Sequence, residues 1–174
     1  MSNAISRKVW LALGGNVGDR VANLRSGLDA LIAGGVEIEA VSSVYGTPPW
    51  PVEEDPRFAN IAISGTTALT AHELLALCKT IEADEGRDLD APRYSARPLD
   101  VDILAIDGEL LSVPDLEVPH ARMHERAFVL VPLAEIAPGF IHPRLGQPVE
   151  ELLTAVDREG IDVIETTGWW SPGA

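Results

Sequence analysis

Two aspartates, Asp100 and Asp102, lie two residues apart inside an apolar segment that runs from Leu99 to Ile106. On a β-strand successive side chains alternate between faces, so both carboxylates would share one face, roughly 6.6 Å apart along the strand. Two like charges this close in a partly desolvated site repel each other unless a cation joins them. Hard divalent cations prefer oxygen ligands, and the pair therefore predicts a Mg²⁺ site.

Arginines gather around this pair in a chain that is otherwise strongly acidic. The chain has 27 acidic and 13 basic residues and a formal net charge of −14. This charge would repel nucleic acid and anionic membranes, so neither is expected as a partner. The arginines instead predict a local anion site, in which Arg97 pairs with phosphate oxygens that Mg²⁺ leaves uncovered. The alternative is a structural ion pair between Arg97 and Asp100. The arginines in question are Arg87, Arg93, Arg97, Arg122 and Arg126.

Two histidines and two arginines follow the aspartates, just before or within the start of an expected helix. They are His120, Arg122, His124 and Arg126. Cationic side chains at a helix N-terminus counteract the helix dipole unless an anion is present, so the cluster predicts phosphate binding. A zinc site is disfavoured because the histidines have no cysteine partner. Either histidine, taken alone, is equally compatible with a surface or packing role.

An aromatic ring and an amide share one face of another expected strand. They are Phe58 and Asn60, and Phe128 supplies a second ring from elsewhere in the chain. Two rings that enclose a flat heterocycle, with an amide that reads its edge, would use such a set. Core packing is the alternative for the phenylalanines, whereas a buried Asn60 would need hydrogen-bond partners.

The elements that would position these residues follow from hydrophobic periodicity and capping residues. Strands are expected at 9–13, 36–45, 58–67, 99–106 and 161–165, and an Asp107-Gly108 turn predicts a hairpin into a strand at 109–113. One helix would run from the Asp19 cap to the Gly34-Gly35 stop, and a capping box of Thr70 and Glu73 would open another that ends at Gly86. Two further helices are expected at 125–136 and 149–156. The Gly14-Gly15 turn fits neither the dinucleotide nor the P-loop pattern.

This order of elements is typical of an α+β protein with a ferredoxin-like sandwich and a mostly antiparallel central sheet. With 174 residues, of which 46% are hydrophobic, the chain is expected to form a single domain over 1–174, with 1–7 and 167–174 peripheral. It lacks an apolar stretch of roughly 18 residues and a signal peptide, and Cys78 is its one cysteine. We therefore expect a cytoplasmic protein, with no obligatory protein partner.

The chain resembles the 6-hydroxymethyl-7,8-dihydropterin pyrophosphokinase family of folate biosynthesis. The family's fold is a ferredoxin-like α/β/α unit, which implies helices on both faces of the sheet. The resemblance covers most of the chain and rests on Leu13-Gly14-Gly15-Asn16, on 42–49 (SSVYGTPP), on Phe58-Ala59-Asn60, on Ile81-Glu82 with Gly86-Arg87, on 97–102 (RPLDVD) and on 118–133.

The resemblance implies an ATP-dependent enzyme that transfers pyrophosphate to a hydroxymethylpterin and releases AMP. Asp100 and Asp102 would hold two Mg²⁺ ions that bridge the ATP phosphates. The implied catalytic residues are Arg87, Arg97, Asp100 and Asp102. The implied ATP contacts are Glu82, Arg87, Arg97, Ile103, His120 and Arg126. The implied pterin contacts are Thr47, Pro48, Pro49, Trp50, Phe58, Asn60 and Phe128, with the pterin stacked between the two phenylalanines.

The loop at 87–98 departs from the family pattern. Leu89 stands where the family usually has a second arginine, and Asp90 follows it. Losing a cation and gaining an anion here should weaken phosphate stabilisation, although Arg93 is a candidate replacement. Two alternatives therefore stay open. One is another two-metal nucleotidyl- or phosphotransferase, which would not need the ring and amide set. The other is a non-catalytic ligand-binding domain descended from the enzyme.

Overall fold

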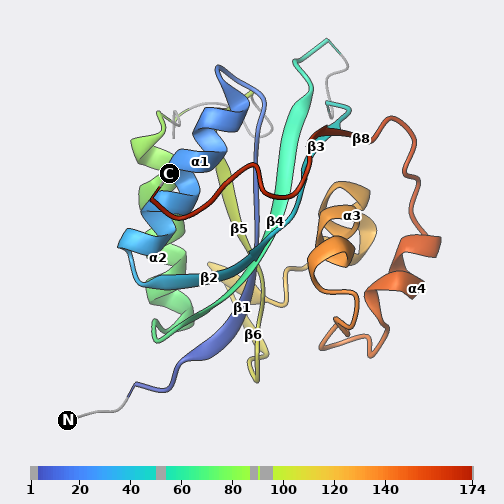
Figure 1. The fold of residues 1–174 in the computed structure, drawn as a ribbon. Helices are drawn as coiled ribbons and strands as arrows, with labels where there is room; N and C mark the ends of the chain where they lie inside the picture. The colour runs from blue at the N-terminus through green and yellow to red at the C-terminus, as the bar shows by residue number, and fades with distance from the viewer. Residues whose placement is uncertain (1–3, 50–53, 87–89, 91–95, 174) are drawn as a thin grey trace.

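A six-stranded antiparallel sheet forms the centre of the molecule (Figure 1). The structure is a computed structural model that describes residues 4–49, 54–86, 90 and 96–173. Within these residues, β1 (Arg7–Gly15) lies between β4 (Phe58–Thr67) and β5 (Asp100–Ile106). On the other side of β4, its first half pairs with β3 (Val44–Thr47) and its second half with β2 (Val36–Val41), and β8 (Asp162–Glu165) pairs with β3. The predicted α+β class with an antiparallel sheet is confirmed.

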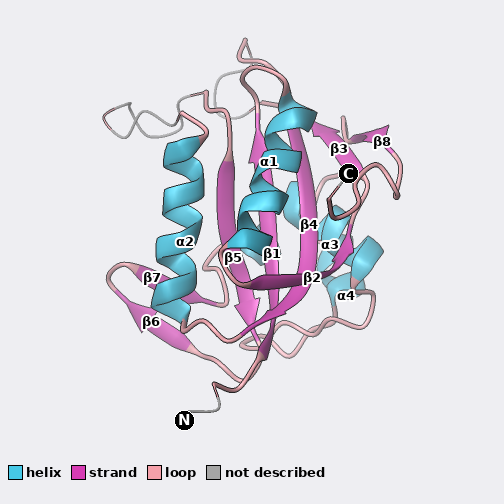
Figure 2. Cartoon of the chain, turned by 60° about the vertical axis from the view of Figure 1, so that its left-hand side comes forward, coloured by secondary structure: helices cyan, strands magenta, loops and turns pink. Residues whose placement is uncertain are grey.

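Helices α1 (Arg20–Ala33) and α2 (Ala71–Asp84) lie side by side on one face of this sheet (Figure 2). Both begin where the sequence predicts, because Asp19 accepts a hydrogen bond from the Ala22 amide and Thr70 forms a capping box with Glu73. Their buried faces meet the sheet in a first hydrophobic core. Its fully buried members include Leu11, Leu13, Leu24, Leu28, Leu31, Ile61, Ile63, Leu74, Cys78 and Leu99.

The opposite face carries α3 (Ala127–Ile136) and α4 (Val149–Thr154), preceded by the 3₁₀ turn η1 (Met123–Glu125). Leu130 and Leu133 of α3 pack with Leu104 of β5 and Val149 of α4 in a second core. Helices therefore cover both faces of the sheet, as the family resemblance implies (Figure 1). None of the described helices is long and apolar enough to cross a bilayer.

We expect the substitution Leu28→Ala to lower the free energy of unfolding by about 3 kcal/mol, because it leaves a cavity between α1 and the sheet. The Leu28 side chain is fully buried in the first core. Urea denaturation followed by circular dichroism measures the change. Leu110→Ala is the matched control because that leucine is 61% exposed, and equal losses in the two variants would contradict the assignment of Leu28 to the core.

The strand expected at 36–45 is divided in the structure into β2 and β3. The division falls at Ser42 and Ser43. The Ser42 side-chain Oγ accepts a hydrogen bond from the Ala62 amide at 3.0 Å, and the Ser42 amide donates to the Ala62 carbonyl at 3.0 Å. The Ser42 hydroxyl thus accepts a hydrogen bond that a backbone carbonyl would accept in a regular pair of strands. The chain can therefore turn here while it stays bonded to β4.

The hairpin predicted from Asp107-Gly108 is wrong in its pairing. A turn occurs there, with Gly108 at a φ of 73°, but the strand that follows, β6 (Leu111–Val113), pairs with β7 (Leu116–Val118) in a separate small sheet. At the turn, the Asp107 amide donates to the Lys8 carbonyl of β1. The sequence therefore predicts the turn correctly, but β6 pairs with β7, which follows it in the chain, and not with β5.

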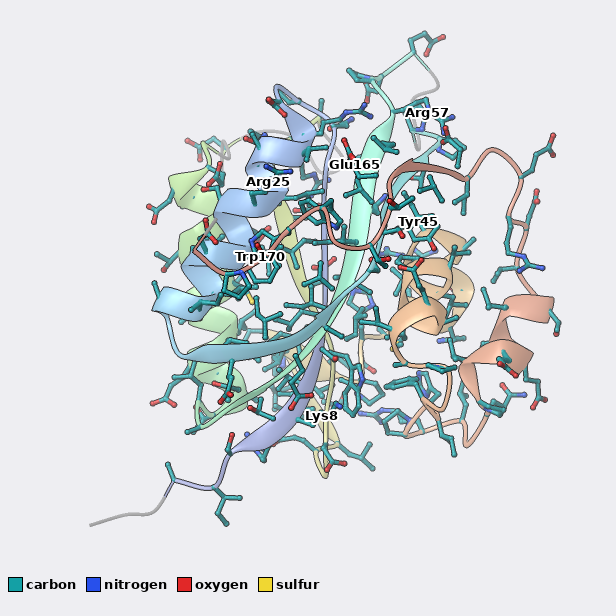
Figure 3. All side chains as sticks on the ribbon, in the orientation of Figure 1. Lys8, Arg25, Tyr45, Arg57, Glu165 and Trp170 are labelled. Carbon is teal, nitrogen blue, oxygen red and sulfur yellow. The ribbon has the colours of Figure 1, made fainter. Side chains whose placement is uncertain are left out.

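The C-terminal segment crosses back over β2 and α1. The Trp169 indole donates to the Ser42 carbonyl at 2.8 Å, and Arg25 of α1 donates to the Trp169 carbonyl at 2.8 Å. Both Trp169 and Trp170 are half-buried against the first core. Figure 3 shows Arg25 and Trp170 together over α1. The tryptophan pair therefore covers the junction between β2 and β3.

Candidate active site

Asp100 and Asp102 lie on β5 with both side chains on one face, as their spacing predicts. Val101 and Ile103, which alternate with them, are 4% and 5% exposed in the first core on the other face. Both aspartates are half-buried. The strand thus presents two carboxylates on one side while the intervening apolar residues anchor it to α1 and α2.

Across β1, the first aspartate is in register with the predicted pterin-binding amide. Asp100 pairs with Gly14, and Gly14 pairs in turn with Asn60 of β4. Adjacent strands lie about 4.8 Å apart, so Asn60 and Asp100 are separated by about 10 Å on one face of the sheet. The predicted metal and heterocycle residues are therefore neighbours, although 40 residues separate them in the chain.

Gly14 leaves room for the Asn60 side chain. A Cβ built at Gly14 would overlap Oδ1 of Asn60. The Asn60 amide nitrogen donates to Oγ1 of Thr47 at 2.7 Å, and both residues are buried. This bond fixes the orientation of the amide and joins two of the residues that the resemblance assigns to the pterin.

We expect Gly14→Ala to raise the KM for the hydroxymethylpterin that the resemblance implies by about tenfold, because the new methyl group would overlap Oδ1 of Asn60 and push the amide out of its present position. Gly139→Ala is the control, since a Cβ there would meet nothing within 4 Å. Steady-state kinetics with each substrate varied in turn measures the change. An unchanged KM for the pterin in a folded Gly14→Ala enzyme would contradict the role given to Asn60.

Arg97 is held close to Asp100. Its Nη1 lies 3.1 Å from Oδ1 and 3.0 Å from Oδ2 of Asp100, so the ion pair named as the structural alternative is present. Asn16, which the sequence reasoning missed, positions the Arg97 backbone. Its Oδ1 accepts from the Arg97 backbone amide at 2.9 Å, and the Asn16 backbone amide donates to the Arg97 carbonyl at 3.0 Å. An asparagine directly after a glycine turn was the available signal, because a buried amide demands partners.

Glu82 lies near the aspartates from the α2 side. It is 7% exposed, and its charge, together with that of Asp102, acts on Cys78. Burial first, and then these two carboxylates, raise the pKa of the Cys78 thiol to about 12. The thiol therefore stays protonated and is not a nucleophile. Ile103 is buried in the first core, on the face of β5 opposite the aspartates.

His120 follows a cis Val118-Pro119 bond, and its amide donates to the Leu104 carbonyl of β5 at 2.8 Å. Its ring Nδ1 accepts from the Arg122 amide at 3.1 Å. Burial, followed by the charges of Arg126 and Arg122, lowers the pKa of His120 from 6.5 to about 4. The ring is therefore neutral at pH 7 and lies close enough to two arginines for their charges to act on it.

The lowered pKa of His120 predicts a pH-dependent stability. The unfolded chain binds this proton more readily than the folded chain. The free energy of unfolding should therefore be highest above pH 6.5 and fall as the pH drops toward about 4. Burial also lowers the pKa of His142, so His120→Gln should flatten this dependence without abolishing it. Urea denaturation across this pH range measures the slope. An identical slope in His120→Gln would show that His120 does not titrate in this way.

The two phenylalanines are not core residues. Phe58 is half-buried, Phe128 is 38% exposed, and neither belongs to either hydrophobic core. The Arg126 guanidinium lies 5.6 Å from the centroid of the Phe128 ring, so the predicted nucleotide and pterin residues adjoin at the start of α3. The core-packing alternative is therefore wrong for both rings.

Some predicted residues lie outside the described part of the chain. These are Arg87 and Trp50, together with Leu89 and Arg93 of the loop that departs from the family pattern. Pro48 and Pro49 are described and directly follow β3.

Among the described residues no group of three or more His, Cys, Asp or Glu side chains could hold a metal by itself. A hollow of about 530 Å³ beside Trp10 and Phe140 lies beyond the Asp107 end of β5 and is lined by none of the predicted site residues.

The sequence matches the family model described as 7,8-dihydro-6-hydroxymethylpterin-pyrophosphokinase over residues 10–138. It is 42% identical over 159 residues to the 2-amino-4-hydroxy-6-hydroxymethyldihydropteridine pyrophosphokinase of Methylorubrum extorquens, covering 91% of this chain and 99% of that protein. The Bacillus subtilis protein of the same name is 40% identical over 157 residues, with 88% of each chain covered.

Longer proteins contain a similar region. A mitochondrial folate synthesis bifunctional protein of Arabidopsis thaliana is 45% identical over 129 residues, which are 74% of this chain and 23% of that protein. The crystal structure of wild-type Plasmodium falciparum HPPK-DHPS with pteroate superposes with a TM-score of 0.71 at 15% identity, over 87% of this chain and 42% of that one. The structural match supports the same fold.

Proposed function

The chain belongs to the 7,8-dihydro-6-hydroxymethylpterin-pyrophosphokinase family of folate biosynthesis, and on that premise we propose which reaction its site performs and with which residues. The proposed reaction moves the β- and γ-phosphoryl groups of ATP to the hydroxymethyl oxygen of 6-hydroxymethyl-7,8-dihydropterin and releases AMP. The observation that carries it is the row formed by Asn60, Gly14 and Asp100 across three strands. That row would bring an amide that reads the heterocycle within reach of a carboxylate that binds the metal.

The two aspartates fit a Mg²⁺ site that a nucleotide completes. Mg²⁺ is usually held in such enzymes by one or two carboxylates together with substrate phosphates and water, so a protein site with two carboxylates is sufficient. Asp100 and Asp102 are half-buried on one face, and a cation, Arg97, already neutralises Asp100 there. We assign two Mg²⁺ ions to this pair, which would neutralise charge on the ATP phosphates as the reaction proceeds.

The nucleotide would lie along β5, between α2 and the start of α3. Arg97, His120 and Arg126 would contact its phosphates, because Arg97 pairs with Asp100, the His120 amide is bonded to β5 at Leu104, and the charge of Arg126 acts on His120. Glu82 and Ile103 would lie beside the nucleotide, and Arg87 would close over the phosphates. A neutral His120 suits this role since it can donate from Nε2 while its Nδ1 accepts from the Arg122 amide.

The pterin would stack between Phe58 and Phe128. The Asn60 amide would read its edge, with help from Thr47 and the segment Pro48, Pro49 and Trp50. The two rings support this assignment because neither is packed in a hydrophobic core, and Phe58 lies two residues from the buried Asn60 on β4.

The chemistry requires little covalent participation by the protein. The pterin hydroxymethyl oxygen bonds to the β-phosphorus and loses its proton, while the bond from that phosphorus to the α-phosphate oxygen breaks and AMP leaves with the electron pair. Positioning and charge neutralisation by Arg97 and the other cationic side chains would supply most of the rate.

An assay of the products tests this proposal. The protein is incubated with ATP, Mg²⁺ and 6-hydroxymethyl-7,8-dihydropterin, and the nucleotides are separated by chromatography. We expect AMP and the pterin pyrophosphate in equal amounts. ADP as the sole nucleotide product would exclude pyrophosphoryl transfer, and pterin binding without turnover would favour the non-catalytic alternative.

A further inference from the structure

A hydrogen-bonded cluster joins the end of α3 to the start of β3, outside the residues assigned above. The Glu135 carboxylate of α3 accepts hydrogen bonds from the Ser43 amide, from the Ser43 hydroxyl at 2.9 Å and from the Tyr45 hydroxyl at 2.8 Å. Figure 3 shows Tyr45 between β3 and α3. We call Ser43, Tyr45 and Glu135 the β3–α3 clamp.

The strand side of the clamp depends on Glu135. Ser43 is 4% exposed, and Glu135 is the partner of both its amide and its hydroxyl. Burial and the neighbouring Glu135 carboxylate raise the pKa of Tyr45 to about 12, so its hydroxyl remains a donor. Ser43 and Tyr45 are two residues apart and face α3 together, whereas Val44 between them is buried in the first core.

The clamp lies one step from the proposed pterin residues on the strand. Tyr45 pairs with Asn60 in the β3–β4 ladder, and Thr47 pairs with Phe58. Tyr45 therefore extends the row that already contains Asn60, Gly14 and Asp100. A shift of Tyr45 would be passed directly to Asn60 and, two residues later, to Thr47.

The helix side of the clamp carries the second proposed ring. Phe128 and Glu135 are seven residues apart on α3, which is about two turns, so they share one helix face roughly 10 Å apart. From Ser43 to Thr47 the extended strand covers about 13 Å. Fixing Glu135 at the start of β3 thus constrains where α3, and with it Phe128, lies relative to the strand that carries Thr47.

We propose that Glu135 is a positioning residue for the pterin pocket. It holds α3 against β3, and this contact keeps Phe128 at the distance from the Asn60–Thr47 pair that a stacked pterin requires. The inference rests on the proposed function, because it takes these residues as the pterin contacts. Glu135 itself touches neither substrate. It acts on pterin affinity through Tyr45 and Ser43, and it leaves the aspartates and Arg97 in place.

Direct binding and kinetics of three full-length variants test the clamp. Glu135→Ala removes all three acceptor bonds, and we expect it to weaken pterin binding and raise the pterin KM by about tenfold, with less than about a threefold change in the ATP KM. Glu135→Gln is the conservative variant, since its carbonyl can accept from the Ser43 amide and its amide nitrogen can donate to the two hydroxyls. It should restore most of the affinity. Glu150→Ala removes an exposed carboxylate from α4 and should change neither constant.

The outcomes separate the clamp from the reaction. Equal changes in the two KM values for Glu135→Ala, or an unchanged dissociation constant for the pterin by fluorescence titration, would overturn the clamp while AMP formation by the wild type upholds the proposed function. Conversely, a wild type that binds pterin, makes no AMP and loses pterin affinity with Glu135→Ala would refute the reaction and support the clamp. If the wild type does not bind pterin, both proposals are refuted.

Discussion

Replacing Asp102 by asparagine should reduce AMP formation by about a thousandfold or more, which corresponds to about 4 kcal/mol of lost transition-state stabilisation. Asparagine keeps the shape of the side chain and one oxygen but removes the negative charge that a Mg²⁺ ion needs. Asp102 pairs with Ala12 of β1, so only a methyl group adjoins the carboxylate on the neighbouring strand. No neighbouring acid on β1 can therefore replace it.

The size of this effect is measured by comparing single-turnover rates at saturating ATP and pterin. Asp107→Asn is the control, since Asp107 is an exposed acid just past the other end of β5, and an Asn-Gly turn retains the local geometry. Rates should rise with Mg²⁺ in the wild type and remain low in Asp102→Asn. AMP formation in Asp102→Asn within tenfold of the wild type would exclude Asp102 as a metal ligand.

Much of this site could be predicted because its central signal is local. The alternation of Asp100 and Asp102 with Val101 and Ile103 determines which side chains share a face, and no distant contact can change that parity. Likewise, the Asp19 cap and the Thr70–Glu73 box are formed by side chains and amides three residues apart. Such features depend on residues close together in the chain, which is why the starts of α1 and α2 agree with the sequence.

The errors arose where a distant partner decides the structure. Whether residues 36–45 form one strand depends on Ala62, which the Ser42 hydroxyl bonds in place of a regular ladder contact. The partner of β6 depends on β7 rather than on the turn before it. Asn16 was missed as a site residue for the same reason, because its bonds to the Arg97 backbone join positions 81 residues apart. The periodicity of hydrophobic residues over a short stretch of sequence carries no information about contacts between residues far apart in the chain.

The clamp illustrates an intermediate case. Ser43 and Tyr45 belong to a segment in which the sequence resembles the family. Their hydrogen-bond partner, Glu135, lies some 90 residues later in the chain and reaches them only in the folded protein. The sequence could indicate that these polar residues matter. Only the packing of α3 on the sheet shows that they connect the two walls of the proposed pterin pocket.

Replacing Arg97 by alanine should slow AMP formation but strengthen the binding of Mg²⁺ in the absence of ATP. Arg97 contacts both oxygens of Asp100, and the two side chains are only 18% and 25% exposed. If Asp100 holds a metal as proposed, its oxygens would bind the cation and Arg97 would transfer its hydrogen bonds to phosphate. Arg97→Ala should therefore lower the rate of AMP formation by about a hundredfold or more, because a charge on the transferred group loses its partner. It should also strengthen Mg²⁺ binding in the absence of ATP, because a competing cation is gone.

Isothermal titration with Mg²⁺ alone, together with AMP assays, separates these effects. Arg97→Lys keeps the positive charge but lacks the planar fork that binds two oxygens, so its rate should fall between those of Arg97→Ala and the wild type. Arg158→Ala, an exposed arginine in the turn before β8, should alter neither measurement. An Arg97→Ala enzyme that retains AMP formation within tenfold and binds Mg²⁺ no more tightly would reduce Arg97 to a structural ion pair. The expected combination, weaker catalysis with tighter metal binding, arises only if one guanidinium serves Asp100 before the nucleotide arrives and the phosphates afterwards.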